Sequence, residues 1–162
     1  MFQLTSKTID IFRTFKFKNL KYFNTHNGIA YSCELYHNKT KIADVRNDGD
    51  GGMTHIDYTE SGESVLGKLN LKQYHSKDLG FNIDNEYIIA DLIELAISIK
   101  KSLTKQSKSI VYLKGENICM YSYKRTLSDI SKINKDIIKK HINEITNNGG
   151  IILNTNFNKI GI

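Results

Sequence analysis

The chain of 162 residues carries 23 basic and 17 acidic side chains, and 40% of its residues are hydrophobic. These values are typical of one folded domain, here residues 1–162, and argue against bulk disorder. No apolar run approaches the length of a transmembrane span, and the N-terminal residues lack the apolar core of a signal peptide. We therefore expect a cytoplasmic protein with no membrane partner.

Residues 16–58 alternate apolar and polar side chains between short turns. Two of these turns are rich in Asn and Gly, at 24–28 and 47–52, and a shorter one spans 38–40. Short runs of period two that are separated by turn residues predict an antiparallel β-meander. Its strands are expected at 17–23, 29–37, 41–46 and 53–58.

Helical spacing appears in the rest of the chain. Between Asp84 and Leu103 the apolar side chains form one wide face, which predicts an amphipathic helix capped by Asp84. A last helix is expected from Asn134, its cap, to Asn147, where Asn and Gly residues end it. The other expected elements are an ambiguous short helix within 62–76, a hairpin of 110–114 and 118–123, and a strand at 151–153, followed by a tail, 154–162, that can fray. This order predicts an α+β fold with an N-terminal antiparallel β-meander, a central amphipathic helix, a β-hairpin and a C-terminal helix.

The loop between the third and fourth expected strands is the stretch most suggestive of a site. Turn chemistry alone explains three glycines and two aspartates in six residues, and this is the interpretation we favour. A calcium loop of the EF-hand type fails because Arg46 would take the first ligand position. A dinucleotide-binding fingerprint fails because the glycine spacing is wrong and a strand follows. If the loop binds a ligand, its residues are Arg46, Asn47, Asp48, Gly49, Asp50, Gly51, Gly52 and His55.

An acid–base or metal interpretation uses the strand after this loop. In a strand over 53–58, His55 and Asp57 share one face, and His37 at the end of another strand can join them. A metal-dependent hydrolase would need three such ligands and an open position. The simpler interpretation is that His55 and Asp57 are solvated residues on the polar face of a sheet, so no metal and no cofactor is expected.

A nucleic-acid interpretation uses lysines and tyrosines. Tyr121 and Tyr123 share a strand face and can serve as stacking platforms, as in single-strand binders. Residues 82–162 contain 12 basic and 8 acidic side chains, against 11 and 9 in residues 1–81, so neither half is a concentrated basic patch. Lysines that solvate helix ends and tyrosines that fill a core explain the same residues. The lysines of this interpretation are Lys100, Lys101, Lys105 and Lys108, with Lys139 and Lys140.

The two cysteines, Cys33 and Cys119, each fall in an apolar, strand-like run and form no Cys-x-x-Cys pair. Cysteines in such runs usually behave as small buried hydrophobes. We therefore expect inert thiols and a reducing compartment.

Three stretches follow one another in the first part of the chain: the run Gly28 to Tyr36, the triplet Lys41 to Ala43 and the loop Asn47 to Gly52. Together they resemble small uncharacterised proteins of bacteriophages and mobile elements, in which a strand pair leads into an Asn-Asp/Glu-Gly-x-Gly-Gly loop. The position matching Asp50 varies among those proteins, which counts against Asp50 as an obligatory ligand. The resemblance implies a phage-type origin and no particular activity. Abundant Ile, Lys and Asn, which have A/T-rich codons, agree with a low-GC bacterial or viral genome.

Three functions are compatible with these features. The leading hypothesis is a non-enzymatic, phage-type accessory protein that binds a host or defence-system protein and modulates or inhibits it, by analogy with other small motif-free proteins of that origin. It predicts an exposed apolar or tyrosine-rich patch near the glycine-rich loop. The alternatives are a nucleic-acid or nucleotide-binding protein, whose affinity would fall steeply with salt, and a metal-dependent hydrolase centred on His55 and Asp57.

Overall fold

The computed structural model describes residues 12–69, 71, 85–115 and 117–160. The chain divides into two compact units, residues 1–96 (unit 1) and residues 97–162 (unit 2), and the boundary falls within one helix. Each unit has its own β-sheet. The fold is α+β, as the sequence predicts, while the expectation of a single domain stays a prediction. No helix in the described ranges is long and apolar enough to cross a membrane.

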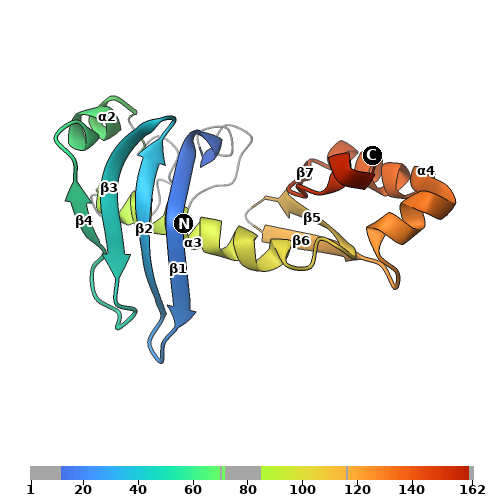
Figure 1. Cartoon of the computed structure of the whole chain (residues 1–162), viewed down its shortest axis with the longest axis horizontal. Helices are drawn as coiled ribbons and strands as arrows, with labels where there is room; N and C mark the ends of the chain where they lie inside the picture. The colour runs from blue at the N-terminus through green and yellow to red at the C-terminus, as the bar shows by residue number, and fades with distance from the viewer. Residues whose placement is uncertain (1–11, 70, 72–84, 116, 161–162) are drawn as a thin grey trace. The chain divides into compact units, whose positions relative to one another are not determined.

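Unit 1 is built on a four-stranded antiparallel sheet whose strands follow one another in chain order (Figure 1). The predicted meander is therefore confirmed. The fourth strand begins two residues later than predicted because Thr54 closes the preceding loop: its hydroxyl lies 2.8 Å from the Tyr31 hydroxyl and accepts a hydrogen bond from the Asn47 amide at 3.1 Å. The strands are β1 (Phe15–Asn24), β2 (Ile29–His37), β3 (Thr40–Asn47) and β4 (His55–Tyr58).

The inner face of this sheet is buried, and α3 (Asn85–Leu103) crosses behind the strands in Figure 1. Alternation along β2 and β3 turns every second side chain inward, and the apolar face predicted for the helix supplies the other side of the core. Burial raises the pKa of the Tyr31 hydroxyl to about 12, and the α3 carboxylates of Glu94 and Asp91 add to this shift. The buried side chains of the two layers include Cys33, Leu35, Ala43, Val45, Ile88, Ile89, Leu92 and Ile93.

A short helix, α2 (Gly62–Leu69), contacts β3 and lies within the segment that the sequence left ambiguous. Its side chain Leu66 is only 1% exposed, and this burial anchors the helix. Tyr74, which the sequence placed in the same helix, and Asp84, the expected cap of α3, lie outside the described residues.

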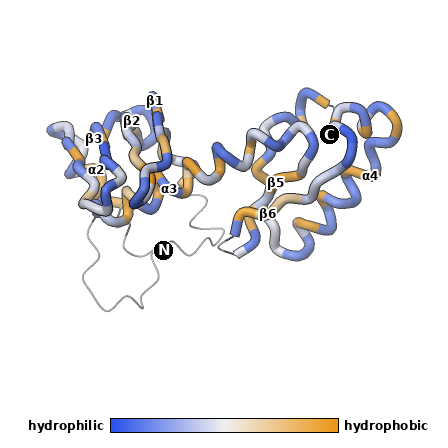
Figure 2. The backbone as a smooth tube through the Cα atoms, turned by 90° about the horizontal axis from the view of Figure 1, so that it is seen from below, coloured by the Kyte–Doolittle hydropathy of each residue, from blue (hydrophilic) through white to orange (hydrophobic). Residues whose placement is uncertain are grey.

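Unit 2 contains a second sheet, which packs against α4 (Leu127–Asn147). Its three strands lie in the order β6 (Asn117–Ser122), β5 (Ser109–Lys114) and β7 (Ile151–Ile152). The predicted hairpin and the short strand after the last helix are confirmed. Ile110, Leu127 and Ile138 form the buried centre of this unit. Figure 2 shows hydrophobic positions recurring along α4 between hydrophilic ones, the pattern of a helix that covers a sheet with one face.

Helix α4 starts one turn or more before the predicted start at Asn134. Thr126 caps it, because its side-chain oxygen accepts a hydrogen bond from the backbone N–H of Asp129 at 3.1 Å. Asn134 then breaks the helix with φ −160° and ψ 95°, and its own side chain accepts from the N–H of Asp136 at 3.0 Å. The sequence therefore identified a genuine cap at Asn134, but it is the cap of the second of two helical segments.

The described part of the tail, 154–160, is held against unit 2 instead of fraying. The Asn154 side chain accepts from the N–H of Val111 at 2.6 Å and donates to the Ser109 carbonyl at 2.9 Å, which satisfies backbone groups at the start of β5. The 3₁₀ helix η3 (Phe157–Ile160) follows, and both of its terminal side chains pack on the core of the unit. No apolar period marks these contacts in the sequence, because a single asparagine and two separated apolar residues make them.

Candidate functional site

The glycine-rich loop 47–52 folds back on the β1–β2 turn. The Gly49 N–H donates to the Asn47 side-chain oxygen at 2.7 Å, and the Thr25 hydroxyl donates to the Gly49 carbonyl at 2.5 Å. Gly49 has a φ of +76° and is buried, while Gly51 has a φ of +80° and is exposed. Positive φ and close packing thus account for these glycines without a ligand, as the favoured interpretation of the sequence holds.

The charged residues of this loop point to solvent. Exposed side chains include Asp48 and Asp50 in the loop and Arg46 and His55 beside it. Met53, which follows the loop, has a side chain that is 75% exposed. Their role as a binding loop stays a prediction.

Alanine at Gly49 should destabilise the protein more than alanine at Gly51. A Cβ at Gly49 would lie 2.6 Å from the backbone nitrogen of Ala30 and 2.7 Å from a methyl carbon of Thr25, whereas a Cβ at Gly51 meets nothing within 4 Å. Both substitutions impose a positive φ on a side chain, which costs about 1 kcal/mol, and Gly49→Ala adds a steric cost for a total of about 2 kcal/mol. Urea unfolding of the two variants measures the difference, and equal losses would mean that the loop does not pack on the β1–β2 turn.

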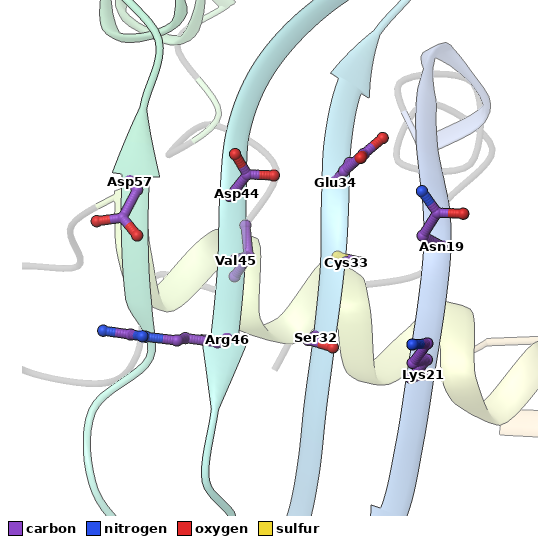
Figure 3. Close-up of a pocket in the computed structure, with 9 residues that line it drawn as sticks. All are labelled: Asn19, Lys21, Ser32, Cys33, Glu34, Asp44, Val45, Arg46 and Asp57. Carbon is purple, nitrogen blue, oxygen red and sulfur yellow. The ribbon is translucent and has the colours of Figure 1, made fainter.

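The outer face of the unit 1 sheet, opposite α3, has a cavity of about 360 Å³. Strand pairing aligns Glu34 with Asp44 and Asp44 with Asp57, so three carboxylates stand in a row across neighbouring strands (Figure 3). A second row of paired residues lies two positions from the carboxylate row along each strand, and its side chains are basic or neutral. It consists of Lys21, Ser32 and Arg46. The face therefore offers both signs of charge, which suits a surface with complementary charges better than a single anion or cation.

No group of three or more His, Cys, Asp or Glu side chains that could hold a metal ion occurs among the described residues. His55 and Asp57 do share the exposed face of β4, as the sequence predicted. His37 lies two residues after Leu35 and so belongs to the other side of β2, where its ring centroid is 5.3 Å from that of Phe15. Partial burial there lowers the pKa of His37. The hydrolase hypothesis therefore stays a prediction, with no third ligand within the described ranges.

The two cysteines differ in their surroundings. Cys33 is buried, and this burial raises the pKa of its thiol to about 12, with the carboxylates of Asp44 and Glu34 adding to the effect. A thiol with such a pKa stays protonated at neutral pH and is a poor nucleophile. Cys119 is only half-buried, so the predicted burial is confirmed for Cys33 and holds in part for Cys119.

In unit 2 the two tyrosines of the nucleic-acid interpretation, Tyr121 and Tyr123, both contact His141. Sequence reasoning did not name this histidine as a site residue. Tyr121 lies 3.2 Å from Nε2 of His141, and Tyr123 lies 2.7 Å from Nδ1 of the same ring, each measured from the phenolic oxygen. The ring centroids of Tyr121 and His141 are 4.3 Å apart, and those of the two tyrosines 5.2 Å. Burial, followed by the neighbouring Tyr121 and Glu144, raises the pKa of Tyr123 to about 12. The sequence signal was present, since His141 interrupts the apolar side of the last helix, but only the fold brings that helix to β6.

The two units differ in formal net charge. Residues 97–162 contain 12 basic and 4 acidic side chains, a formal net charge of +8, whereas residues 1–96 contain 11 and 13, a net charge of −2. A division of the sequence at its midpoint hides this contrast, because four acidic residues lie between the midpoint and the boundary of the two units. Those residues are Asp84, Glu86, Asp91 and Glu94.

The lysines predicted for a nucleic-acid surface all belong to unit 2. Lys100, Lys105 and Lys108 are exposed and Lys101 is half-buried. The backbone N–H of Tyr123 donates to the Lys108 carbonyl at 2.8 Å, which places the end of this lysine series beside the tyrosine cluster. The other exposed basic residues of the unit are Lys114, Lys124, Arg125, Lys132, Lys135, Lys139, Lys140 and Lys159.

Comparison with known proteins gives no further guide. No family model matches the chain, and neither the search of curated proteins nor that of solved structures finds a match. The resemblance to bacteriophage proteins therefore stays a prediction, and any function has to be argued from the two units themselves.

Proposed function

We propose that unit 2 binds nucleic acid. The observation that carries this proposal is the segregation of charge, with a net charge of +8 in 66 residues beside a unit of net charge −2. A basic domain with exposed lysines and arginines attracts the phosphate backbone and releases the counterions condensed on it. The described basic side chains of unit 2 are exposed except for Lys101, so they face the solvent from which a phosphate backbone would approach.

Compositional bias does not account for this charge. A low-GC genome enriches lysine along the whole chain, yet unit 1, which comes from the same gene, has more acidic than basic residues. The excess therefore belongs to one folded unit, as expected when the charge serves a partner. The partner it favours is polyanionic.

The salt dependence of binding tests this proposal. We expect the full chain to bind a labelled duplex of about 20 base pairs, with log K falling linearly as log salt rises and a slope near −0.9 for each phosphate contacted. Replacing both Lys139 and Lys140 with alanine should reduce the steepness of this slope by roughly 0.9 for each of the two lysines that contacts a phosphate, and the affinity by about tenfold at 0.1 M salt. Fluorescence anisotropy across a salt series measures both quantities.

The matched control removes the same charge from unit 1. Lys39 and Lys68 are exposed there, and the double variant Lys39→Ala/Lys68→Ala lowers the net charge of the chain by the same two units. It should leave the slope and the affinity nearly unchanged. The proposal fails if the wild-type chain shows no salt-dependent binding, or if the two double variants weaken binding equally.

The host-directed binding hypothesis keeps a surface of its own in unit 1. The cavity between the acidic row and the row of Lys21, Ser32 and Arg46 offers a protein partner complementary charge. The described exposed residues near the glycine-rich loop include Phe23 and Met53, at 66% and 75% exposure. A partner captured equally well by the wild-type chain and by the Lys139→Ala/Lys140→Ala variant would support this second function.

A further inference from the structure

The break at Asn134 gives unit 2 two short helices in succession. The first, 127–133, starts at the Thr126 cap, and the second, 135–147, starts at the Asn134 cap. Figure 1 shows α4 changing direction between them. Because one extended residue separates the helices, each has its own axis and its own exposed face.

The second helix is fixed to unit 2 by its inner face. Ile138 is fully buried, and Ile142 and Ile145 pack on the same core. Gly150, after the helix, is buried with its N–H donating to the Ile145 carbonyl at 2.8 Å. The helix is therefore held along its length, and the face away from Ile138 points out of the unit.

That outward face is polar and evenly spaced. Its residues recur at intervals of three and four, so they lie along one line of the helix. All are exposed, and within the described chain no hydrogen bond or ion pair engages the side chains of Lys139, Lys140 and Asn143. The face consists of Asp136, Lys139, Lys140, Asn143 and Asn147.

These side chains have the chemistry of base recognition in duplex DNA. Asparagine pairs with the N6 and N7 edge of adenine, lysine with O6 and N7 of guanine, and aspartate accepts from N4 of cytosine. An α-helix, about 10–12 Å in diameter, fits the major groove, which is about 12 Å wide. Lys124, Arg125 and Lys132 precede this helix in the chain and are exposed, and basic side chains of this kind supply the phosphate contacts that position a protein on a duplex.

A single-stranded ligand fits the same unit less well. Binders of single strands stack bases on open aromatic rings. In unit 2 the ring of Tyr121 is stacked on His141 at 4.3 Å, and the hydroxyls of both Tyr121 and Tyr123 are engaged by that histidine. Each of the two tyrosine rings predicted as stacking platforms thus already has a neighbouring ring of the protein, which leaves less of it open to a base.

We propose that residues 135–147 form a recognition helix that enters the major groove of double-stranded DNA, with Asn143 and Lys140 reading base edges. The proposal rests on the nucleic-acid function proposed for unit 2 and adds the form of the ligand and the groove. It gives the second helix the role of the recognition helix in a helix-turn-helix and places the first beside the backbone, with the single extended residue Asn134 in place of the three- to four-residue turn of that motif.

Selection from a duplex library tests this inference on the full chain. Duplexes with a randomised centre are enriched on the wild-type protein and sequenced, and a preferred site of a few base pairs is expected. Asn143→Ala should lose discrimination at one position of that site by about tenfold and keep the salt slope of the wild type. Asn27→Ala, which removes an exposed amide from unit 1, should keep both. Protection of guanine N7 from dimethyl sulfate in the preferred site would locate the contact in the major groove.

The outcomes separate this inference from the function on which it rests. Salt-dependent binding with no enriched sequence, or with stronger affinity for single strands or RNA than for duplex, would overturn the recognition helix and leave nucleic-acid binding intact. No binding to any nucleic acid would overturn both. If Asn143→Ala fails to fold by circular dichroism, Asn143→Gln, which keeps the amide but moves it outward by one methylene, should shift or weaken the same base preference.

Discussion

Replacing Gly62 with alanine should destabilise the folded protein by about 3 kcal/mol or more. Gly62 is the first residue of α2 and is buried against β3, where an added Cβ would lie 2.0 Å from the carbonyl oxygen of Ile42 and 2.9 Å from its carbonyl carbon. The same carbonyl oxygen accepts hydrogen bonds from the N–H of Thr59 at 2.8 Å and from its hydroxyl at 3.1 Å. Because the obstacle is hydrogen-bonded backbone in a central strand, it cannot rotate away as a side chain would, and α2 itself has to move.

A second glycine in the same helix provides the control. Gly67 is exposed and a Cβ there meets nothing within 4 Å, so Gly67→Ala should stabilise the protein by up to about 1 kcal/mol through helix propensity. Urea unfolding followed by circular dichroism measures the two changes with opposite expected signs. A loss of less than about 1 kcal/mol for Gly62→Ala would show that α2 does not approach β3 as closely as described.

Gly62 also illustrates which parts of the fold the sequence could reveal. Alternation of side chains along 29–37 and 41–46 depends only on neighbouring residues, so the meander was predictable, and helical spacing revealed α3 for the same reason. Gly62 has no local signature, because its importance comes from Ile42, which is twenty residues earlier and meets it only in the folded chain. Asn154 is similar, since its bonds to residues at the start of β5 span more than forty positions.

The candidate site in unit 2 was predictable only in its components. Lys139, Lys140 and the tyrosines stood out by residue type, and Asn134 was recognisable as a cap. The sequence could not show that the charge changes sign near residue 97, because the boundary lies inside an uninterrupted amphipathic helix that looks the same on both sides. The role proposed for Lys140 and Asn143 was not predictable either, because an ordinary solvated helix face has the same residue types and because only the structure shows a helical segment on both sides of Asn134.

Replacing Ile138 with alanine should cost about 3 kcal/mol and should act on unit 2. The side chain is fully buried at the centre of the core that joins α4 to β5, so its loss leaves a cavity between helix and sheet. Ile133 offers the matched control, because it is the same side chain at the end of the first segment of α4 but is 69% exposed, and Ile133→Ala should change the free energy of unfolding by less than about 0.5 kcal/mol. Equal effects of the two substitutions would contradict the orientation of α4 on which both proposals for unit 2 depend.

Calorimetry of the Ile138→Ala and Gly62→Ala variants extends this test to the two units. A chain that unfolds as one cooperative domain should show a single transition that either substitution lowers, whereas separately folding units should each respond to only one of them.

If the units unfold separately, the two variants should also differ in duplex binding. Gly62→Ala should leave the affinity of unit 2 for DNA intact at temperatures where unit 1 has melted. Ile138→Ala should lose DNA binding at the lowered melting temperature of unit 2. The reason is that the outward line of Lys139, Lys140 and Asn143 has a fixed direction only while Ile138 holds the opposite face of the helix to the core.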